Sequence, residues 1–108
     1  MKRPCVYILS NHARGTLYVG VTSDLIGRVW QHKHDLVDGF SKQHQLHLLV
    51  YFEVADTMLV AIAREKQLKK WNRTWKIELI ETINSEWRDL YLDLVASYIQ
   101  NGFPLAWE

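Results

Sequence analysis

The chain has 108 residues, of which 48% are hydrophobic and 23% charged, a balance typical of a globular protein with one modest core. Its net charge of +1 argues against a protein that binds polyanions over its whole surface, and no apolar run is long enough to cross a membrane. The single cysteine, Cys5, excludes an internal disulfide and a cysteine metal site. Because the N-terminal residues show no signal-peptide pattern, we expect a cytoplasmic protein with no membrane contact.

Two strands are predicted first, over residues 4–9 and 16–21, because both runs are rich in strand-forming side chains. Turn-forming residues separate them, so we expect an antiparallel hairpin. Gly15 is predicted to take the left-handed conformation of its turn. Gly20, inside the second strand, predicts a bulge or the close approach of another group.

A helix is predicted to start at Asp24, with Thr22 or Ser23 as its cap. Arg28 and His32 are four residues apart, so we expect them on one side of this helix.

The segment 35–45 is polar and irregular and is predicted to be a loop. Residues 46–54 have the strongest strand pattern of the chain, and we expect this strand at the centre of a sheet.

Three helices are predicted to follow. The first is capped by Asp56 or Thr57, and the last begins at a Ser85 cap and ends at Gly102 with Pro104. The residues expected to face inward are Leu59, Ile62, Leu68 and Trp71 in the first helix, Trp75, Leu79 and Ile83 in the second, and Trp87, Leu90, Tyr91, Leu94, Val95 and Tyr98 in the last.

The order β-β-α-β-α-α-α predicts a small mixed α/β domain with at least one antiparallel strand pair. We expect one domain over residues 1–108, with a core over about 3–95 and a C-terminal helix and tail over 85–108.

Charge is unevenly distributed along the second half of the chain. Residues 64–76 hold six of the thirteen basic residues and one acid, Glu65, whereas residues 77–108 hold six acids and one base. Two interpretations stay open: two solvated helix faces of opposite charge, or a patch that faces phosphates. Trp71 and Trp75 within the basic segment do not decide between them.

A group of chemically capable side chains suggests metal-assisted phosphodiester hydrolysis. The hydroxyls of Tyr7 and Tyr18 could converge on paired strands, Arg28 suits a phosphate, and His32 can move a proton. Glu65, an isolated acid, could hold a divalent cation. Each also has a structural explanation: tyrosines pack at core edges, and a helical Arg or Glu is usually a surface charge or an ion-pair partner.

The triplets Cys5-Val6-Tyr7 and Tyr18-Val19-Gly20, followed by Arg28 and His32, resemble the GIY-YIG nuclease domain. Within that superfamily the chain is similar to the small single-domain predicted endonucleases over roughly residues 3–95. Cys5 departs from the pattern because it stands where the family has a glycine, which could crowd Tyr7.

This resemblance implies an α+β fold in which helices flank a small, mostly antiparallel sheet of three strands. It implies an endonuclease that hydrolyses DNA with one Mg²⁺ or Mn²⁺ ion. Either tyrosine is a candidate general base, with His32 assisting, Arg28 stabilising the phosphoryl charge and Glu65 binding the metal. A late asparagine, Asn72 or Asn84, is a further candidate.

DNA is the expected partner, with branched and single-stranded DNA among the candidate substrates. Because no separate DNA-binding domain is expected, targeting must come from the basic segment, from a homodimer or from a partner protein. The alternative is a non-catalytic module that binds nucleic acid or protein on the same scaffold. The residues expected to contact DNA are Lys42, Lys66, Lys69, Lys70 and Arg73.

Overall fold

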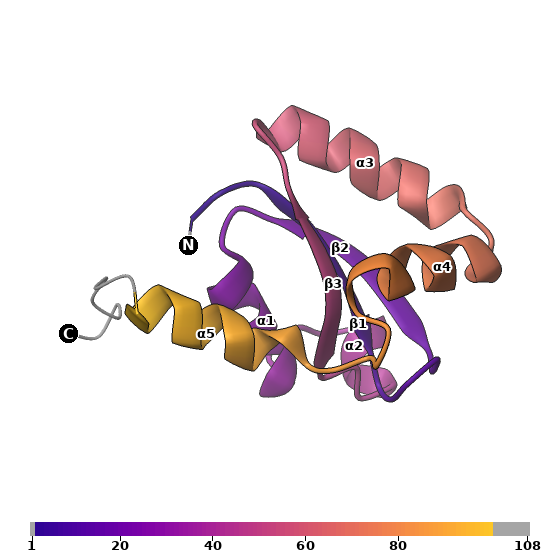
Figure 1. Cartoon of the computed structure of the whole chain (residues 1–108), viewed down its shortest axis with the longest axis horizontal. Coiled ribbons are helices and arrows are strands. Elements are labelled where there is room, and N and C mark those ends of the chain that lie inside the picture. The colour runs from indigo at the N-terminus through magenta and orange to yellow at the C-terminus, as the bar shows by residue number, and fades with distance from the viewer. Residues whose placement is uncertain (1, 101–108) are drawn as a thin grey trace.

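The structure is a computed structural model that describes residues 2–100, and its helices flank both faces of a three-stranded sheet (Figure 1). This arrangement confirms the predicted α+β fold and the order of its main elements. One short helix, α2, is added inside the segment predicted to be a loop. The elements are β1 (Cys5–Ser10), β2 (Leu17–Thr22), α1 (Leu25–Lys33), α2 (Phe40–Gln43), β3 (Leu48–Val54), α3 (Met58–Lys70), α4 (Arg73–Ile83) and α5 (Leu90–Gln100).

The strands lie in the order β2-β1-β3, and both pairs are antiparallel. The central strand is therefore β1, and the prediction that the strand over 46–54 is central was wrong. All six residues of β1 are buried, whereas β3 becomes more exposed toward Val54. An apolar run predicts burial, but helices as well as neighbouring strands can supply that burial, so it does not identify the central strand.

Side chains from the segment between α4 and α5 bond to the backbone of β3. Asn84 Nδ2 donates to the Val50 carbonyl at 3.0 Å, and the Leu49 amide donates to Asp89 Oδ1 at 3.1 Å. These bonds provide partners for polar groups on a strand that has only one neighbouring strand.

Alternate residues of β1 enter two separate cores, as the two-residue period of a strand requires. Val6 and Ile8 pack on the face that α3 and α4 cover. Cys5, Tyr7 and Leu9 pack on the opposite face, beneath α1 and α5 (Figure 1). The burial of Cys5 in this second core places it in the same cluster as Tyr7.

Two predicted helix starts change in the structure. Asp24 is the cap of α1 rather than its first residue, because its carboxylate accepts the Gly27 amide at 3.2 Å. Ser85 does not cap α5, which begins only at Leu90. Asn84 holds the intervening segment in a non-helical conformation through bonds to the amide and carbonyl of Arg88. For α3, the structure selects Thr57, one of the two predicted caps.

The end of the last helix predicted at Gly102 with Pro104 lies outside the described residues. Trp87, expected on the inner face of that helix, is buried but lies before α5, with a φ of 59°.

Several residues expected to face inward are exposed. Leu59 on α3 is 80% exposed and Trp75 on α4 is 53% exposed, and Ile83 is exposed as well. Leu68 is buried as predicted. Apolar residues occur around most of these helices, so their spacing alone did not identify the face that packs on the sheet.

The turn between β1 and β2 uses a different residue from the one predicted. Arg14, not Gly15, has the positive φ, at 55°. Gly15 is needed for space instead, because a Cβ there would lie 2.0 Å from Asn11 Oδ1. Arg73 fixes this turn by donating to the carbonyls of Arg14 and Gly15. No helix within residues 2–100 has the length and apolar character needed to cross a membrane.

Candidate active site

The Tyr7 ring extends from the central strand β1 across Gly20 of the edge strand β2. Tyr7 and Gly20 are paired between β1 and β2, so their side-chain positions share one face of the sheet. A Cβ on Gly20 would lie 2.4 Å from Cζ of Tyr7 and 2.5 Å from its hydroxyl. The close approach predicted at Gly20 is thus confirmed, and the approaching group is the Tyr7 ring.

Tyr7, Tyr18 and His32 form one aromatic cluster. The ring centroids of the two tyrosines lie 6.3 Å apart, and the His32 ring lies 5.7 Å from Tyr7 and 5.6 Å from Tyr18. The Tyr7 hydroxyl is hydrogen-bonded to His32 Nε2 at 2.9 Å. Both partners of that bond are only 2% exposed, whereas Tyr18 is partly exposed.

The second ring nitrogen of His32 also has a partner. Nδ1 lies 2.9 Å from Oγ of Ser41 on α2, and Ser41 is 4% exposed. Ser41 is not among the predicted site residues, because it lies in a polar segment without periodicity, nine residues beyond His32. The three side chains form a buried chain, Tyr7–His32–Ser41, that links β1, α1 and α2.

Burial and neighbouring charges shift the acidity of both Tyr7 and His32. Burial is the main cause that raises the pKa of Tyr7, and Tyr18 and the Glu65 carboxylate add to it while Arg28 opposes it. Burial, then Arg28, then His47 lower the pKa of His32 to about 4. His32 is therefore neutral near pH 7, so one of its ring nitrogens carries no proton and can act as an acceptor.

Arg28 and Glu65 both lie within electrostatic reach of Tyr7, since each affects its pKa. Arg28 comes from α1, one turn before His32, as predicted. Glu65 comes from α3, which packs against β2 and β1. The two charges come from helices on opposite faces of the sheet, and both act on Tyr7.

Glu65 is the one predicted metal ligand. Its side chain is 15% exposed, and its carboxylate lies 3.3 Å from Nζ of Lys69. Within residues 2–100 there is no group of three or more His, Cys, Asp or Glu side chains arranged to hold a metal. One carboxylate fits Mg²⁺ or Mn²⁺ if substrate phosphate and water complete the coordination, as is common for Mg²⁺.

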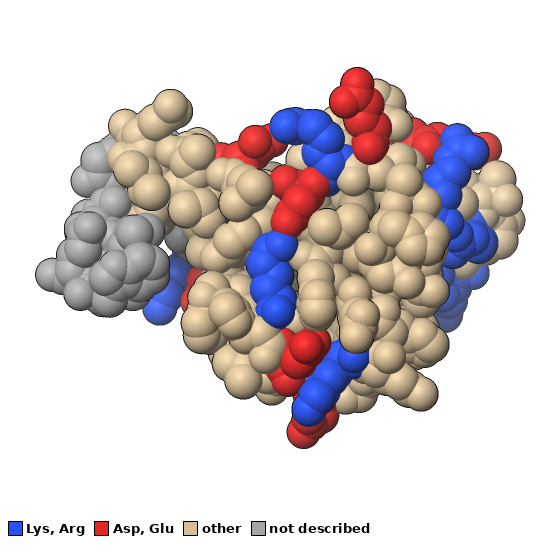
Figure 2. All heavy atoms as spheres, turned by 90° about the horizontal axis from the view of Figure 1, so that it is seen from below, with Lys and Arg blue, Asp and Glu red and all other residues tan. Residues whose placement is uncertain are grey.

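The basic residues expected to contact DNA fall into two groups. Lys69 and Arg73 already have partners, Glu65 and the turn carbonyls respectively, and Lys42 lies 3.7 Å from Asp38. In the described part of the chain, no ion pair is recorded for Lys66 or Lys70, which are exposed on α3. Figure 2 shows Lys and Arg side chains gathered at the end of the molecule where α3 meets α4.

Both candidate asparagines have structural contacts. Asn72 caps α4, where its side chain accepts the Trp75 amide at 2.8 Å. Asn84 holds β3 and the segment before α5 together.

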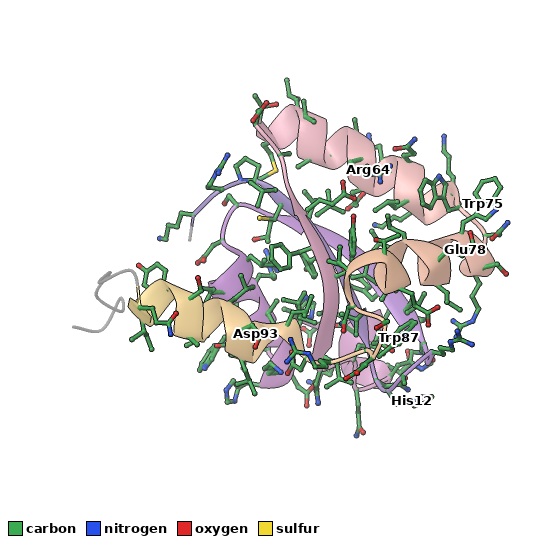
Figure 3. The ribbon with its side chains drawn as sticks, viewed as in Figure 1. His12, Arg64, Trp75, Glu78, Trp87 and Asp93 are labelled. Atoms are coloured by element: carbon green, nitrogen blue, oxygen red, sulfur yellow. The ribbon has the colours of Figure 1, made fainter. Side chains whose placement is uncertain are left out.

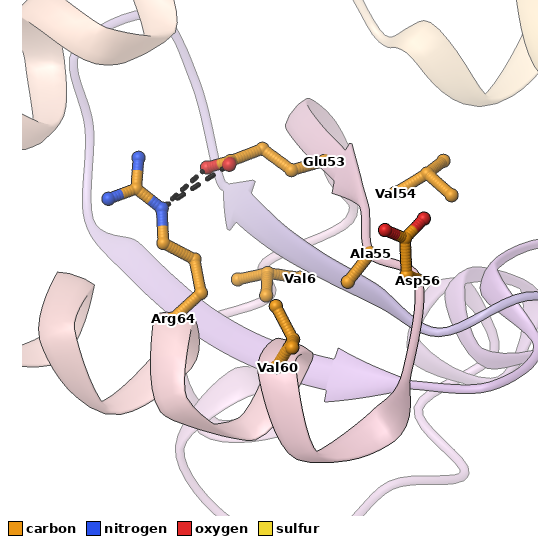
Figure 4. A pocket seen from close by; sticks show the side chains of 7 residues that line it. All are labelled: Val6, Glu53, Val54, Ala55, Asp56, Val60 and Arg64. Atoms are coloured by element: carbon orange, nitrogen blue, oxygen red, sulfur yellow. Dashed lines mark hydrogen bonds and ion pairs between the residues drawn. The ribbon is translucent and has the colours of Figure 1, made fainter.

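A hollow of about 270 Å³ lies among residues of β1, β3 and α3 (Figure 4). Val6, Glu53 and Arg64 line it, and Val6 is on the face of β1 opposite Tyr7. Two of its charged side chains pair with each other, at 3.0 Å between Arg64 Nε and Glu53 Oε2. The hollow is therefore separate from the candidate site.

Comparison with known proteins identifies the family. The chain is 32% identical over 82 residues to a UPF0213 protein of Syntrophus aciditrophicus, a match that covers 75% of this chain and 93% of that protein. It is 35% identical over 69 residues to a UPF0213 protein of Pediococcus pentosaceus (64% and 73% covered). It is 33% identical over 66 residues to one of Staphylococcus saprophyticus (61% and 80% covered).

No solved structure matches the chain. The sequence model of the GIY-YIG catalytic domain matches residues 3–78, which include Tyr7, Tyr18, Arg28, His32 and Glu65. The chain therefore belongs to the GIY-YIG family of nuclease domains.

Proposed function

We propose that this protein is a metal-dependent endonuclease that hydrolyses phosphodiester bonds in DNA. The observation that carries the proposal is the cluster of Tyr7, Tyr18 and His32, whose rings lie within 6.3 Å of one another. The charges of Arg28 and Glu65 both influence the pKa of Tyr7. A proton acceptor, a guanidinium and a carboxylate at one place are the groups that metal-assisted phosphodiester hydrolysis requires.

Tyr7 is the proposed general base, because its hydroxyl has a neutral imidazole 2.9 Å away. The Tyr7 proton passes to Nε2 of His32 while the phenol oxygen takes a proton from the attacking water. The water oxygen then bonds to phosphorus, and the bond from phosphorus to the leaving oxygen breaks. Tyr18, the more exposed phenol, contacts the water or a phosphate oxygen.

Arg28 binds the phosphate, because its planar fork of donors matches phosphate oxygens. Glu65 would hold the cation, with substrate and water as the other ligands. When bound, Mg²⁺ or Mn²⁺ supplies a positive charge that polarises the phosphate. The Glu65 carboxylate forms an ion pair with Lys69, which a bound cation would have to replace.

Cleavage assays on plasmid, branched and single-stranded DNA test the proposal, with and without Mg²⁺ or Mn²⁺. We expect Tyr7→Phe, Arg28→Ala and Glu65→Gln each to lower the cleavage rate by about 10² or more, the scale on which catalytic groups contribute. Glu78→Gln is the matched control for Glu65, because Glu78 is exposed on α4 (Figure 3). Cleavage that persists in EDTA, or in Glu65→Gln, would rule out the metal role.

The non-catalytic alternative makes a different prediction in the same assays. A module that only binds nucleic acid retains salt-sensitive DNA binding and yields no product at any metal concentration. Binding through Lys66 and Lys70 serves either function, so cleavage is the observation that separates them. Target choice is proposed to come from this basic end of the molecule, from a homodimer or from a partner protein.

A further inference from the structure

Ser41 is a buried polar residue for which neither the motif nor the proposed mechanism has a role. It lies on α2, which consists of a single turn, and its hydroxyl meets Nδ1 of His32 at 2.9 Å. A serine hydroxyl can both donate and accept a hydrogen bond. Ser41 can therefore bond to Nδ1 whether that nitrogen is bare or protonated.

The relative acidity of the two hydroxyls in the chain indicates the direction of its hydrogen bonds. Tyr7 is a phenol and Ser41 an aliphatic alcohol, and the phenol is the stronger acid and hence the stronger donor. The phenol therefore donates to Nε2, and Nδ1–H donates to Oγ of Ser41. In this arrangement Nε2 carries the lone pair that the Tyr7 proton needs.

We propose that Ser41 is a positioning residue that holds the neutral His32 ring with its proton on Nδ1 and its acceptor nitrogen toward Tyr7. This inference rests on the proposed nuclease function. After Tyr7 transfers its proton, His32 has two N–H groups, and Ser41 still accepts the one on Nδ1. The same hydroxyl thus serves the ring before and after the transfer, and no other group has to move.

A pair of substitutions with the same shape isolates the hydroxyl. Ser41→Thr keeps it and Ser41→Val removes it, while both add the same bulk at a site that is 4% exposed. We expect Ser41→Thr to cleave DNA at close to the wild-type rate. We expect Ser41→Val to lower kcat by about 10- to 100-fold, less than the roughly 10²- to 10⁴-fold contribution of an acid–base group itself, with little change in KM.

The histidine itself provides a second readout that does not depend on cleavage. The ¹⁵N chemical shifts of its ring nitrogens report which one carries the proton, and His32→Gln identifies the His32 signals. We expect protonated Nδ1 in the wild type and in Ser41→Thr. In Ser41→Val, a proton on Nδ1 would have no acceptor, so we expect the population to shift toward protonated Nε2.

Each outcome decides a separate point. Equal kcat values for Ser41→Thr and Ser41→Val, or an unchanged proton position in Ser41→Val, overturn the role of Ser41. If the wild type cleaves no DNA, the proposed function fails, and the ¹⁵N shifts still decide whether Ser41 sets the state of His32. Ser41→Ala replaces Ser41→Val in both measurements if thermal unfolding shows that the valine variant does not fold.

Discussion

At the scale of single residues, burial determines what the histidine of this site can do. His32 is 2% exposed, has a hydrogen-bond partner on each ring nitrogen and lies near the guanidinium of Arg28. Burial and the nearby positive charge of Arg28 disfavour a positive charge on the ring, so its pKa falls to about 4. At pH 7 the ring is therefore neutral and has a lone pair available to the Tyr7 hydroxyl, whereas an exposed histidine would be partly protonated.

This shift predicts how stability depends on pH. The unfolded chain binds a proton at His32 below its ordinary pKa of about 6.5, whereas the folded chain does so only near 4. Between these values the unfolded state holds more protons, so the free energy of unfolding decreases as pH falls. From pH 7 to pH 5 we expect His32 to account for a loss of about 2 kcal/mol.

Urea unfolding of the wild type and His32→Gln at pH 7 and pH 5 checks this prediction. The variant is expected to be less stable at pH 7 but to lose about 2 kcal/mol less on acidification. His12→Gln serves as the control, because it also removes an imidazole, but one that is exposed in the turn between β1 and β2. Parallel pH dependences for His32→Gln and the wild type would contradict the buried neutral state.

At the scale of elements, the site depends on the register of β1 against β2. Pairing Tyr7 with Gly20 leaves no side chain on β2 beneath the phenol, so the ring can extend to the edge of the sheet. This arrangement also places Tyr18 one diagonal position away on the same face. A shift of one residue would place Val19 or Val21 beneath Tyr7 and turn Tyr18 to the opposite face.

Gly20→Ala tests this close approach. The new Cβ would lie 2.4 Å from Cζ of Tyr7, and because that ring is buried it cannot move aside freely. We expect a loss of about 1–3 kcal/mol of stability, the usual range for overpacking. In a Tyr7→Leu background, which has no Cζ, the same change should be nearly neutral. Chemical denaturation of the four proteins measures the coupling, and equal costs in both backgrounds would show that the ring does not cause it.

The sequence predicted the strands and the order of the elements because their signals are local. Tyr7 and Tyr18 could be placed on paired strands from the hairpin pattern alone. Ser41 could not be found in this way, since its contact with His32 depends on how a short helix in a polar segment packs on α1. Nor could the central position of β1 be predicted, because strand order depends on long-range pairing that no local pattern records.

At the scale of the whole molecule, one end carries the basic side chains that are proposed to contact DNA. The basic side chains gather where α3 meets α4, and Lys66 and Lys70 have no recorded ion partner in the described residues (Figure 2). Arg73 differs from these lysines, because it holds the turn between β1 and β2. We therefore expect Arg73→Gln to lower the stability of the fold. We expect Lys66 and Lys70 to account for phosphate contacts.

The salt dependence of DNA binding tests this division. Each lysine that neutralises a phosphate contributes about one unit to the slope of log K against log salt concentration. We expect Lys66→Gln with Lys70→Gln to weaken binding and reduce the slope by about 2, without changing the melting temperature. Lys2→Gln is the control, because Lys2 is exposed near the N-terminus, away from the junction of α3 and α4 (Figure 1). An unchanged slope in the double variant would mean that DNA approaches by another surface. Lys42, exposed next to Ser41 on α2, would then be the next residue to test, because Ser41 bonds to His32 on the helix that carries Arg28.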